Sequence, residues 1–355
     1  MTNVFSTVAS LLLPESGESN MEDSSFFRHM VAMSPLRVEL EITEACNLRC
    51  LFCYNNEVPV HLTYEQAREI IDRLVQESVF ELVLTGGEPG YNSDFLKIVS
   101  YATGKIPVVL VQTNGTLFDA KTFQELRSRE IAGMNISLHG EKDIHEKITR
   151  IPGSHDRAIE SIRMCLANQI CLWVNTVITK VNASNIIQHL TFLKNIGVEN
   201  FTFTRFTPIG KGADVNIALS KEELISTLRE IVCFSKENGV SVLLANAVPS
   251  CFLPVDLKFL SEICTFGLNK FYIDVFGNLL YCGMSRIKLG NIFTHSIKQI
   301  KEKSDIFNMN CNNRLCPVEC QTCSSFGKNC RGGCRAAALA DTGSLLGKDP
   351  LLQHI

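Results

Sequence analysis

The chain has 355 residues, of which 45% are hydrophobic and 20% are charged, and its formal net charge is -3 at pH 7. This length suits one large domain with a smaller one, and the composition is that of an ordinary soluble globular protein. The slightly acidic balance argues against a general nucleic-acid binder, because neutralising phosphates requires a surplus of Lys and Arg. We therefore expect no nucleic-acid partner.

The N-terminal stretch, residues 1–36, is rich in Ser, Glu, Asp and Met, and we predict a partly ordered leader. It is too short for an independent recognition domain. Its apolar run at 8–13 lacks a preceding Lys or Arg and cannot span a bilayer, so we expect no membrane association. The fifteen cysteines are an odd number in a long chain, which favours a reducing cytoplasm over a secreted disulfide scaffold.

From Arg37 onward, apolar runs alternate with amphipathic segments, a pattern typical of strand-helix units around a parallel sheet. Expected strands are 38–42, 81–84, 108–112, 133–138, 172–178 and 200–206. Capping boxes at 63–66 and 220–223 predict two helix starts, and other helices are expected near 94–103, 119–129, 155–168 and 184–196. Six such units fit a partial barrel with functional loops after the strands. A doubly wound open sheet is the competing architecture, although no GxGxxG follows the first strand.

Three cysteines follow the first expected strand, Cys46, Cys50 and Cys53, with the spacing CxxxCxxC and an aromatic residue, Phe52, before the last. A four-iron cluster normally takes four thiolates, so a three-cysteine loop leaves one iron open for an outside ligand. The alternative is a structural zinc knuckle. Zinc requires a fourth protein ligand, for which the following residues offer only His61.

A second motif, Gly86-Gly87-Glu88-Pro89, follows the next expected strand. Together with the cysteine loop, it resembles the radical S-adenosylmethionine (SAM) superfamily. The resemblance implies a (β/α)6 partial barrel, a 4Fe-4S cluster on the three cysteines and SAM on the open iron. It also implies an electron donor such as flavodoxin or ferredoxin, and reductive cleavage of SAM to a 5'-deoxyadenosyl radical.

By the same resemblance, Gly86, Gly87 and Glu88 contact the SAM amino group, and Ser137 and Arg150 meet its ribose and carboxylate. Glycines let backbone approach a ligand closely, and a carboxylate accepts from an ammonium group.

Other polar residues near the strand ends are less specific. Asn114 and Asn175 fit strand-end caps nearly as well as ligand contacts, and His139 and His145 are candidate proton carriers or structural histidines. No catalytic acid or base is assigned.

The last third of the chain holds a second group of eight cysteines: Cys264, Cys282, Cys311, Cys316, Cys320, Cys323, Cys330 and Cys334. Their pattern resembles the SPASM extension of radical SAM enzymes. The resemblance implies one or two auxiliary 4Fe-4S clusters, although Leu352 stands where the family usually has its last cysteine. Cys316 or Cys311 is the candidate replacement, and a pair of zinc ribbons is the alternative. We assign Cys264, Cys282 and Cys334 to one cluster with an unassigned fourth ligand, and assign to the other Cys316, Cys320, Cys323 and Cys330. The remaining cysteines are expected to be buried small hydrophobes: Cys165, Cys171, Cys233 and Cys251.

The sequence thus predicts an α/β protein: a partial (β/α)6 TIM-type barrel at 37–248 and a small cysteine-rich iron-sulfur domain at 249–355. The resemblance implies hydrogen abstraction from a peptide or protein substrate. A tetrapyrrole propionate is the alternative substrate, and an electron-transfer protein without SAM chemistry is the alternative class. Gly283 disfavours the sulfatase-maturing subfamily, which usually carries an acid there, and the short N-terminal stretch leaves no room for an added peptide-recognition domain.

Overall fold

The structure is a computed structural model that describes residues 35–55, 58–261 and 263–352. Within these ranges the strands form one sheet in the order β10-β9-β8-β1-β2-β3-β4-β5-β6-β7. The pairs from β8 through β1 to β7 are parallel, and β8-β9 and β9-β10 are antiparallel. The strands are β1 Arg37–Glu41, β2 Glu81–Thr85, β3 Val108–Thr113, β4 Gly133–Ser137, β5 Leu172–Ile178, β6 Asn200–Arg205, β7 Ser241–Leu244, β8 Lys270–Ile273, β9 Asn278–Leu280 and β10 Lys288–Asn291.

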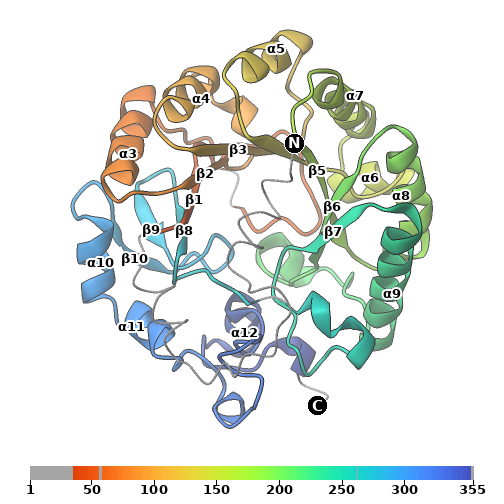
Figure 1. Ribbon diagram of the computed structural model, residues 1–355, viewed down its shortest axis with the longest axis vertical. Coiled ribbons are helices and arrows are strands. Elements are labelled where there is room, and N and C mark those ends of the chain that lie inside the picture. Colours follow the sequence, from red (N-terminus) through yellow and green to blue (C-terminus); the bar gives the residue numbers. More distant parts are fainter. Residues whose placement is uncertain (1–34, 56–57, 262, 353–355) are drawn as a thin grey trace.

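The helices that connect the parallel strands lie along the outside of the curved sheet, so the strands line the inside of an open barrel (Figure 1). This arrangement confirms the predicted α/β fold with a parallel sheet. In chain order these helices are α3 Tyr64–Gln76, α4 Phe95–Thr103, α5 Ala120–Ser128, α6 Lys142–Thr149, α7 Ser154–Ala167, α8 Ile186–Asn195 and α9 Lys221–Asn238.

Both predicted capping boxes are present. The Thr63 hydroxyl accepts from the Gln66 backbone N–H while the Gln66 side chain accepts from the Thr63 N–H, and Ser220 and Glu223 repeat the exchange at the start of α9. In α3 the buried side chains fall at i, i+3, i+4 and i+7: Ala67, Ile70, Ile71 and Leu74. The local sequence therefore fixes both where α3 begins and which face it buries.

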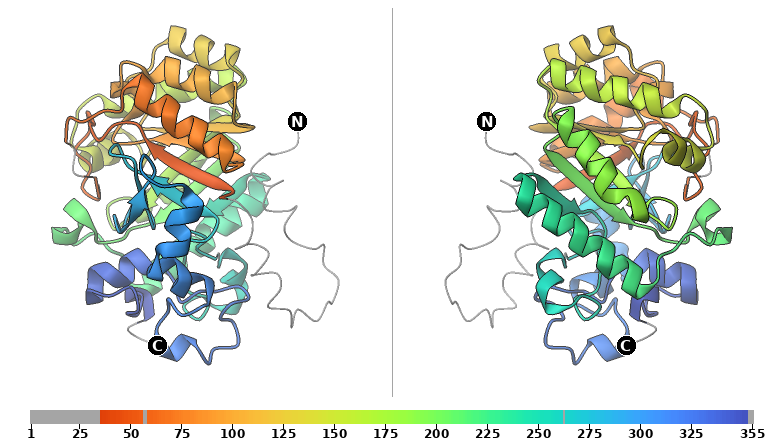
Figure 2. Two further views of the ribbon diagram at one scale, coloured as in Figure 1. Left: turned by 90° about the vertical axis from the view of Figure 1, so that its left-hand side faces the viewer. Right: turned by 90° about the vertical axis from the view of Figure 1, so that its right-hand side faces the viewer.

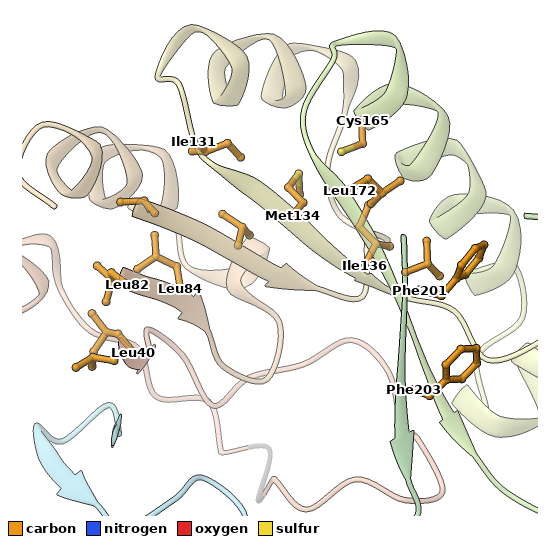
Figure 3. Close-up of a cluster of buried hydrophobic side chains, with 14 of the residues drawn as sticks. Leu40, Leu82, Leu84, Ile131, Met134, Ile136, Cys165, Leu172, Phe201 and Phe203 are labelled. Carbon is orange, nitrogen blue, oxygen red and sulfur yellow. The ribbon is translucent and has the colours of Figure 1, made fainter. Parts of the chain in front are cut away.

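The main hydrophobic core fills the layer between the sheet and its surrounding helices. Side chains from β1, β2, β4, β5 and β6 point into this layer, and Figure 3 shows Leu40, Leu84, Ile136, Leu172 and Phe201 among them. Parallel strands covered by helices read as nearly continuous apolar runs, and β2 is buried along its whole length. The other face of the barrel strands is left for the site.

The sheet extends beyond the six predicted units. β7 adds a seventh parallel strand beside β6, and β8 pairs in parallel with β1 through partners such as Val38 and Phe271. The segment after residue 249 therefore contributes strands to the same sheet, next to the first strand of the barrel. Both additions are strands of four residues, too short to show a clear period in the sequence.

The C-terminal region lies across the open side of the barrel (Figures 1 and 2). It carries α10 Ile297–Lys303, α11 Asp305–Cys311 and α12 Arg335–Thr342, joined by turns and 3-10 segments. A second apolar cluster lies here, and Cys282 and Cys334 are part of it together with Tyr281 and Leu315. No helix within the described ranges is both long and apolar enough to cross a membrane.

Candidate functional site

The loop after β1 carries Cys46, Cys50 and Cys53, and backbone hydrogen bonds anchor it on two sides. On one side, the N–H groups of Arg49 and Leu51 donate to carbonyls at the end of α6, both at 3.0 Å. On the other, the Cys53 carbonyl accepts from Lys211 at 2.9 Å, in the loop that follows β6. The three thiols are partly exposed and in no disulfide. The loop is thus held at the strand ends, where a barrel places its site.

The glycine pair of the second motif packs directly on this loop. Gly87 donates to the Thr43 carbonyl at 2.7 Å, and Glu88 donates to the Ala45 carbonyl at 2.8 Å. A Cβ on Gly86 would lie 2.2 Å from the Thr43 oxygen, and one on Gly87 would lie 2.3 Å from the Ala45 oxygen. Only glycine permits this approach, so the two motifs form one structural unit.

Glu88 is fully buried, and its carboxylate has protein donors. It accepts from the Thr113 hydroxyl at 2.5 Å, from the Asn114 N–H at 2.6 Å and from the Gly90 N–H at 3.2 Å. Burial raises the pKa of Glu88 to about 7, against the opposing effect of these hydrogen bonds. The carboxylate therefore ties the end of β3 to the glycine motif.

A polar network surrounds Cys46. The Asn114 side-chain amide lies 3.8 Å from the Cys46 sulfur and 2.9 Å from the Asn47 side-chain oxygen, and Asn47 donates to the Thr116 hydroxyl at 2.6 Å. The position of Asn114 after the third expected strand makes it a candidate from sequence, whereas Asn47 and Thr116 are functional candidates only in the structure. Both lie next to candidates in the sequence: Asn47 follows Cys46, and Thr116 is two residues after Asn114.

The predicted SAM-contact residues Ser137 and Arg150 lie on neighbouring segments. Ser137 ends β4 opposite Asn175 of β5, and Asn175 accepts from the Thr204 hydroxyl of β6 at 3.0 Å. Polar side chains therefore lie on three neighbouring strands. Arg150 ends α6 with an exposed side chain and a left-handed backbone, φ 59°. Their contacts with SAM remain predictions.

His139 and His145 form part of a buried histidine group. The Nδ1 of His145 accepts from the His139 backbone N–H at 3.1 Å, the two rings stack, and Phe52 packs edge-on against His139. Burial lowers the pKa of His139 to about 3, that of His145 to about 2 and that of His189 to about 4. These rings are neutral at neutral pH, which favours the structural reading for both.

Arg286 joins the first cysteine loop to the loop of Cys282. Its guanidinium pairs with Glu41 at 2.9 Å and with Glu44 at 2.6 Å, and both carboxylates are almost fully buried. Burial raises the pKa of Glu41 to about 7 despite the arginine. Because Glu44 is two residues before Cys46 and Arg286 is four after Cys282, this pair connects the two cysteine regions.

Cys264, Cys282 and Cys334 lie within electrostatic reach of one another. Burial raises the pKa of Cys282 to about 12, and the charges of Cys334 and Cys264 add to the rise. Burial and then the charge of Cys334 also raise the pKa of Cys264. Cys282 and Cys334 also belong to one apolar cluster, which does not include Cys264.

In the second group, the charges of three other cysteines act on Cys320. Burial raises the pKa of Cys320 to about 11, with further rises from the charges of Cys330, Cys316 and Cys251. Cys311 differs: the charges that act on it come from Lys301 and Arg331, and it packs against the main core. Two of the cysteines expected to be buried, Cys233 and Cys251, are exposed, so that expectation was wrong for them; Cys165 is buried, as predicted.

A buried ion pair fixes the segment at Leu352. Arg205, at the end of β6, pairs with Asp349, and the same carboxylate accepts from the Cys334 backbone N–H at 2.7 Å. Leu352 donates to the Asp349 carbonyl at 2.7 Å, and its side chain is buried. The position where the resemblance places a final cysteine is therefore a buried apolar residue.

Among the described residues, no three His, Cys, Asp or Glu side chains are arranged to hold a metal ion, and this includes the cysteines after β1. The donor chemistry nevertheless fits an iron-sulfur cluster there: the three thiols are in no disulfide, and backbone and side-chain N–H groups approach the Cys46 sulfur. For the zinc alternative, His61 already pairs through Nδ1 with the Thr43 hydroxyl at 2.8 Å. A cluster bound at Cys46, Cys50 and Cys53 would supply the electron that cleaves SAM.

Residues 40–193 match the model of the radical SAM superfamily, a region that includes the cysteine loop and the glycine motif. The chain has a radical SAM domain, and it is an enzyme with SAM-dependent radical chemistry. The superfamily uses a 4Fe-4S cluster and SAM, as predicted.

The similarity to curated relatives extends over most of the chain. The chain is 26% identical over 344 residues to the AdoMet-dependent heme synthase of Methanosarcina barkeri, and the match covers 90% of this chain and 97% of that protein. It is 27% identical over 328 residues to the mycofactocin maturase MftC of Mycolicibacterium smegmatis, covering 89% and 82%. The crystal structure of Streptococcus suis SuiB bound to its precursor peptide SuiA superposes with a TM-score of 0.75 at 17% identity, covering 98% and 86%, which establishes the shared fold.

Proposed function

We propose that this radical SAM enzyme modifies a peptide or protein by abstracting a hydrogen atom from it. In this proposal Cys46, Cys50 and Cys53 hold the cluster that cleaves SAM, and the strand-end groups hold SAM itself: Gly86, Gly87, Glu88, Ser137 and Arg150. Because the Glu88 carboxylate already accepts three protein donors, its part is to orient the glycine backbone toward the SAM amino group. The mycofactocin maturases among its relatives support a peptide substrate.

One structural observation favours a peptide over a tetrapyrrole, the alternative suggested by the relatives named heme synthase. Propionate side chains carry negative charge, and binding them in a protein interior calls for available cations. Two buried or half-buried arginines beside the cysteine loops have acceptors in the protein: Arg286 pairs with Glu41 and Glu44, and Arg205 pairs with Asp349. Both sets of carboxylates would have to lose their partner for these arginines to bind a propionate.

We further propose that the C-terminal cysteines bind auxiliary 4Fe-4S clusters. The first would use Cys264, Cys282 and Cys334, and the second would use thiols of the group Cys316, Cys320, Cys323 and Cys330. Such clusters relay electrons or position the substrate, and a small flavodoxin or ferredoxin would supply the first electron. Fifteen cysteines that form no disulfide fit a reducing cytoplasm, where iron-sulfur proteins keep their ligands reduced.

The substrate class is tested with the reduced, reconstituted enzyme and SAM. Two probes are compared: a synthetic peptide encoded by a short reading frame beside the gene, and iron-coproporphyrin III. We expect the peptide to increase 5'-deoxyadenosine formation and to change mass, and the tetrapyrrole to do neither. Turnover of the tetrapyrrole with an unchanged peptide would contradict the proposal.

A Cys50→Ala variant tests the assignment of the SAM cluster. We expect it to lose 5'-deoxyadenosine formation by at least about 1000-fold, since a two-thiolate loop cannot retain the cluster that supplies the electron. Auxiliary iron should remain in this variant. Cys165→Ala, which changes a buried cysteine between α7 and the sheet, is the matched control and should keep SAM cleavage. Wild-type cleavage by Cys50→Ala would refute the assignment.

A further inference from the structure

Within the described ranges the sheet ends in two edge strands, β10 on one side and β7 on the other. An edge strand exposes unpaired backbone N–H and C=O groups, which can pair with a strand of another chain. Proteins usually block such edges with charged side chains, proline or a β-bulge. The two edges of this sheet differ in whether they are blocked.

β10 carries two of these blocking features. Lys288, its first residue, is exposed. The pairing register with β9 shifts between Lys288 and Gly290, as at a β-bulge, and a bulge bends and twists a strand away from regular pairing. A further strand is therefore disfavoured beside β10.

β7 has no such protection. Its four residues, Ser241-Val-Leu-Leu244, include no charge, proline or glycine, and they pair with β6 in an unbroken register. Ser241, Val242 and Leu243 are only half-buried, so the surrounding segments do not fully cover the strand. β7 is the last strand of the barrel and borders its open side (Figure 1). This edge is therefore open to another strand.

The pairing with β6 determines which backbone groups of β7 point outward. The Ala245 N–H donates to the Phe203 carbonyl at 2.7 Å. In a parallel pair every second residue bonds to a given neighbour, so the N–H and C=O groups of Val242 and Leu244 point away from β6. No other residue in the part of the chain that the structure describes forms a hydrogen bond with these four groups.

β7 lies next to the strand that leads into the candidate site. On β6, the Thr204 hydroxyl donates to Asn175 of β5 at 3.0 Å, and the loop after β6 holds the cysteine loop through the bond from Lys211 to the Cys53 carbonyl. Because β6 and β7 are parallel, one end of a segment added to β7 would lie at the same end of the sheet as the cysteine loop.

The chemistry of the β7 edge matches an extended peptide backbone. Its two N–H and two C=O groups alternate along one line, and a strand presents donors and acceptors with the same spacing. A tetrapyrrole has no such row of groups. Leu243 is paired with Thr202 and shares its face of the sheet, so every second side chain of the peptide would lie beside Leu243. The uncharged strand favours apolar or uncharged side chains there.

We propose that the β7 edge binds an extended segment of the peptide substrate by strand addition. Backbone hydrogen bonds to Val242 and Leu244 hold the segment, and contact with Leu243 contributes to its specificity. This inference rests on the proposed peptide substrate and deepens it. A single strand continues the plane of the sheet, whereas a second copy of the protein would meet the C-terminal region that lies across the same side (Figure 1).

A Val242→Pro variant of the full-length, reconstituted enzyme tests the edge. Because the Val242 N–H points away from β6, proline removes an outward donor without breaking a bond of the sheet, and proline is tolerated at such edge positions. The probe is the synthetic peptide encoded by the short reading frame beside the gene, with SAM present and no reductant. We expect its Kd to rise at least about 10-fold. Val242→Thr keeps the N–H and should bind like wild type.

N-methylated peptides test the same contact on the wild-type enzyme, so a folding defect of a variant cannot imitate the result. One backbone nitrogen is methylated at a time. Binding should weaken at every second residue of the segment, where the N–H faces β7, and not at the residues between. When the unmodified peptide binds, hydrogen exchange at the Val242 and Leu244 amides should slow.

Unchanged affinity of Val242→Pro, or N-methyl effects without a period of two residues, would overturn this inference without contradicting the peptide substrate. Slow exchange at Val242 and Leu244 in the free enzyme would also overturn it, because a second copy or residues 1–34 would already fill the edge. If the peptide did not bind the wild-type enzyme, the proposed peptide substrate would itself be overturned, and this inference with it.

Discussion

At the residue scale, the contact between the glycine motif and the cysteine loop allows no side chain. We expect Gly87→Ala to destabilise the fold by about 1–3 kcal/mol, because its Cβ would lie 2.3 Å from the Ala45 oxygen and backbone must move. We also expect this variant to bind less iron at the SAM cluster, because the displaced loop carries Cys46. The measurements are the unfolding midpoint and the iron per chain.

Gly104→Ala is the control for this substitution. Gly104 is exposed after α4, has an ordinary φ of -74°, and its Cβ would meet nothing closer than 3.6 Å. We expect a change within about 0.5 kcal/mol there. Equal effects of the two substitutions would show that the close packing of Gly87 has no special role.

Glu88 gives a residue-scale prediction about pH. Its folded pKa, about 7, lies above its ordinary value of 4.5, so the folded state holds the proton more tightly than the unfolded state. The stabilisation that this provides is complete below pH 4.5 and is lost as the pH rises to about 7. In Glu88→Gln this loss, on the order of 1–3 kcal/mol, should be absent.

The check is the difference in unfolding midpoint between wild type and Glu88→Gln, measured at pH 5 and at pH 8. Glu230→Gln, at an exposed position of α9, is the control and should show the same pH profile as wild type. If the wild-type and Glu88→Gln profiles were parallel, burial would not perturb this carboxyl.

At the element scale, Arg286 connects the loop after β1 with the loop after β9. Arg286→Ala leaves Glu41 and Glu44 buried without a cation, a change that typically costs about 3–5 kcal/mol. Arg286→Lys should recover part of this loss, because a single ammonium cannot bridge both carboxylates as the guanidinium does. The measurements are unfolding midpoints of the anaerobic holoprotein.

Arg229→Ala is the matched control for Arg286. It breaks an ion pair with Asp256 in which both side chains are 54% exposed, and exposed pairs contribute about 0–1 kcal/mol. A loss in Arg286→Ala no larger than that in Arg229→Ala would mean that the link between the two cysteine loops does not contribute to stability.

The sequence predicted the barrel elements well and their tertiary partners poorly. Capping boxes and the 3.6-residue period are local signals, and α3 and α9 begin where those signals indicate. By contrast, Arg286 meets Glu41 across 245 residues, and no local pattern encodes that pairing. Cys251 illustrates the same limit: an apolar context suggested burial, whereas the packing of its neighbours leaves the thiol outside.

At the scale of the whole molecule, buried histidines and buried carboxyl groups have opposite effects on how stability depends on pH. Three histidines with lowered pKa, His139, His145 and His189, take up protons on unfolding between about pH 4.5 and 6.5, while Glu41 and Glu88 with raised pKa release theirs. Three taken up and two released leave a net uptake of about one proton in this window. Stability should therefore fall with acidification by about 1.4 kcal/mol per pH unit.

The slope of unfolding free energy against pH measures this net uptake. In Glu88→Gln one released proton is removed from the balance, so the slope should rise to about two protons. A slope of zero or of opposite sign in wild type would show that the histidines are not held neutral in the folded state.

The pairing of β8 with β1 also affects how the chain folds during its synthesis. β1 is made first, yet its partner on one edge, Lys270–Ile273, emerges from the ribosome more than two hundred residues later. Until then, a nascent barrel that has already paired β2 through β7 exposes the backbone donors and acceptors of β1, which is a template for wrong strand addition. Successful folding during translation thus depends on how long this edge of β1 stays unpaired. A chaperone that covers an extended strand would act on this chain before its last third is made.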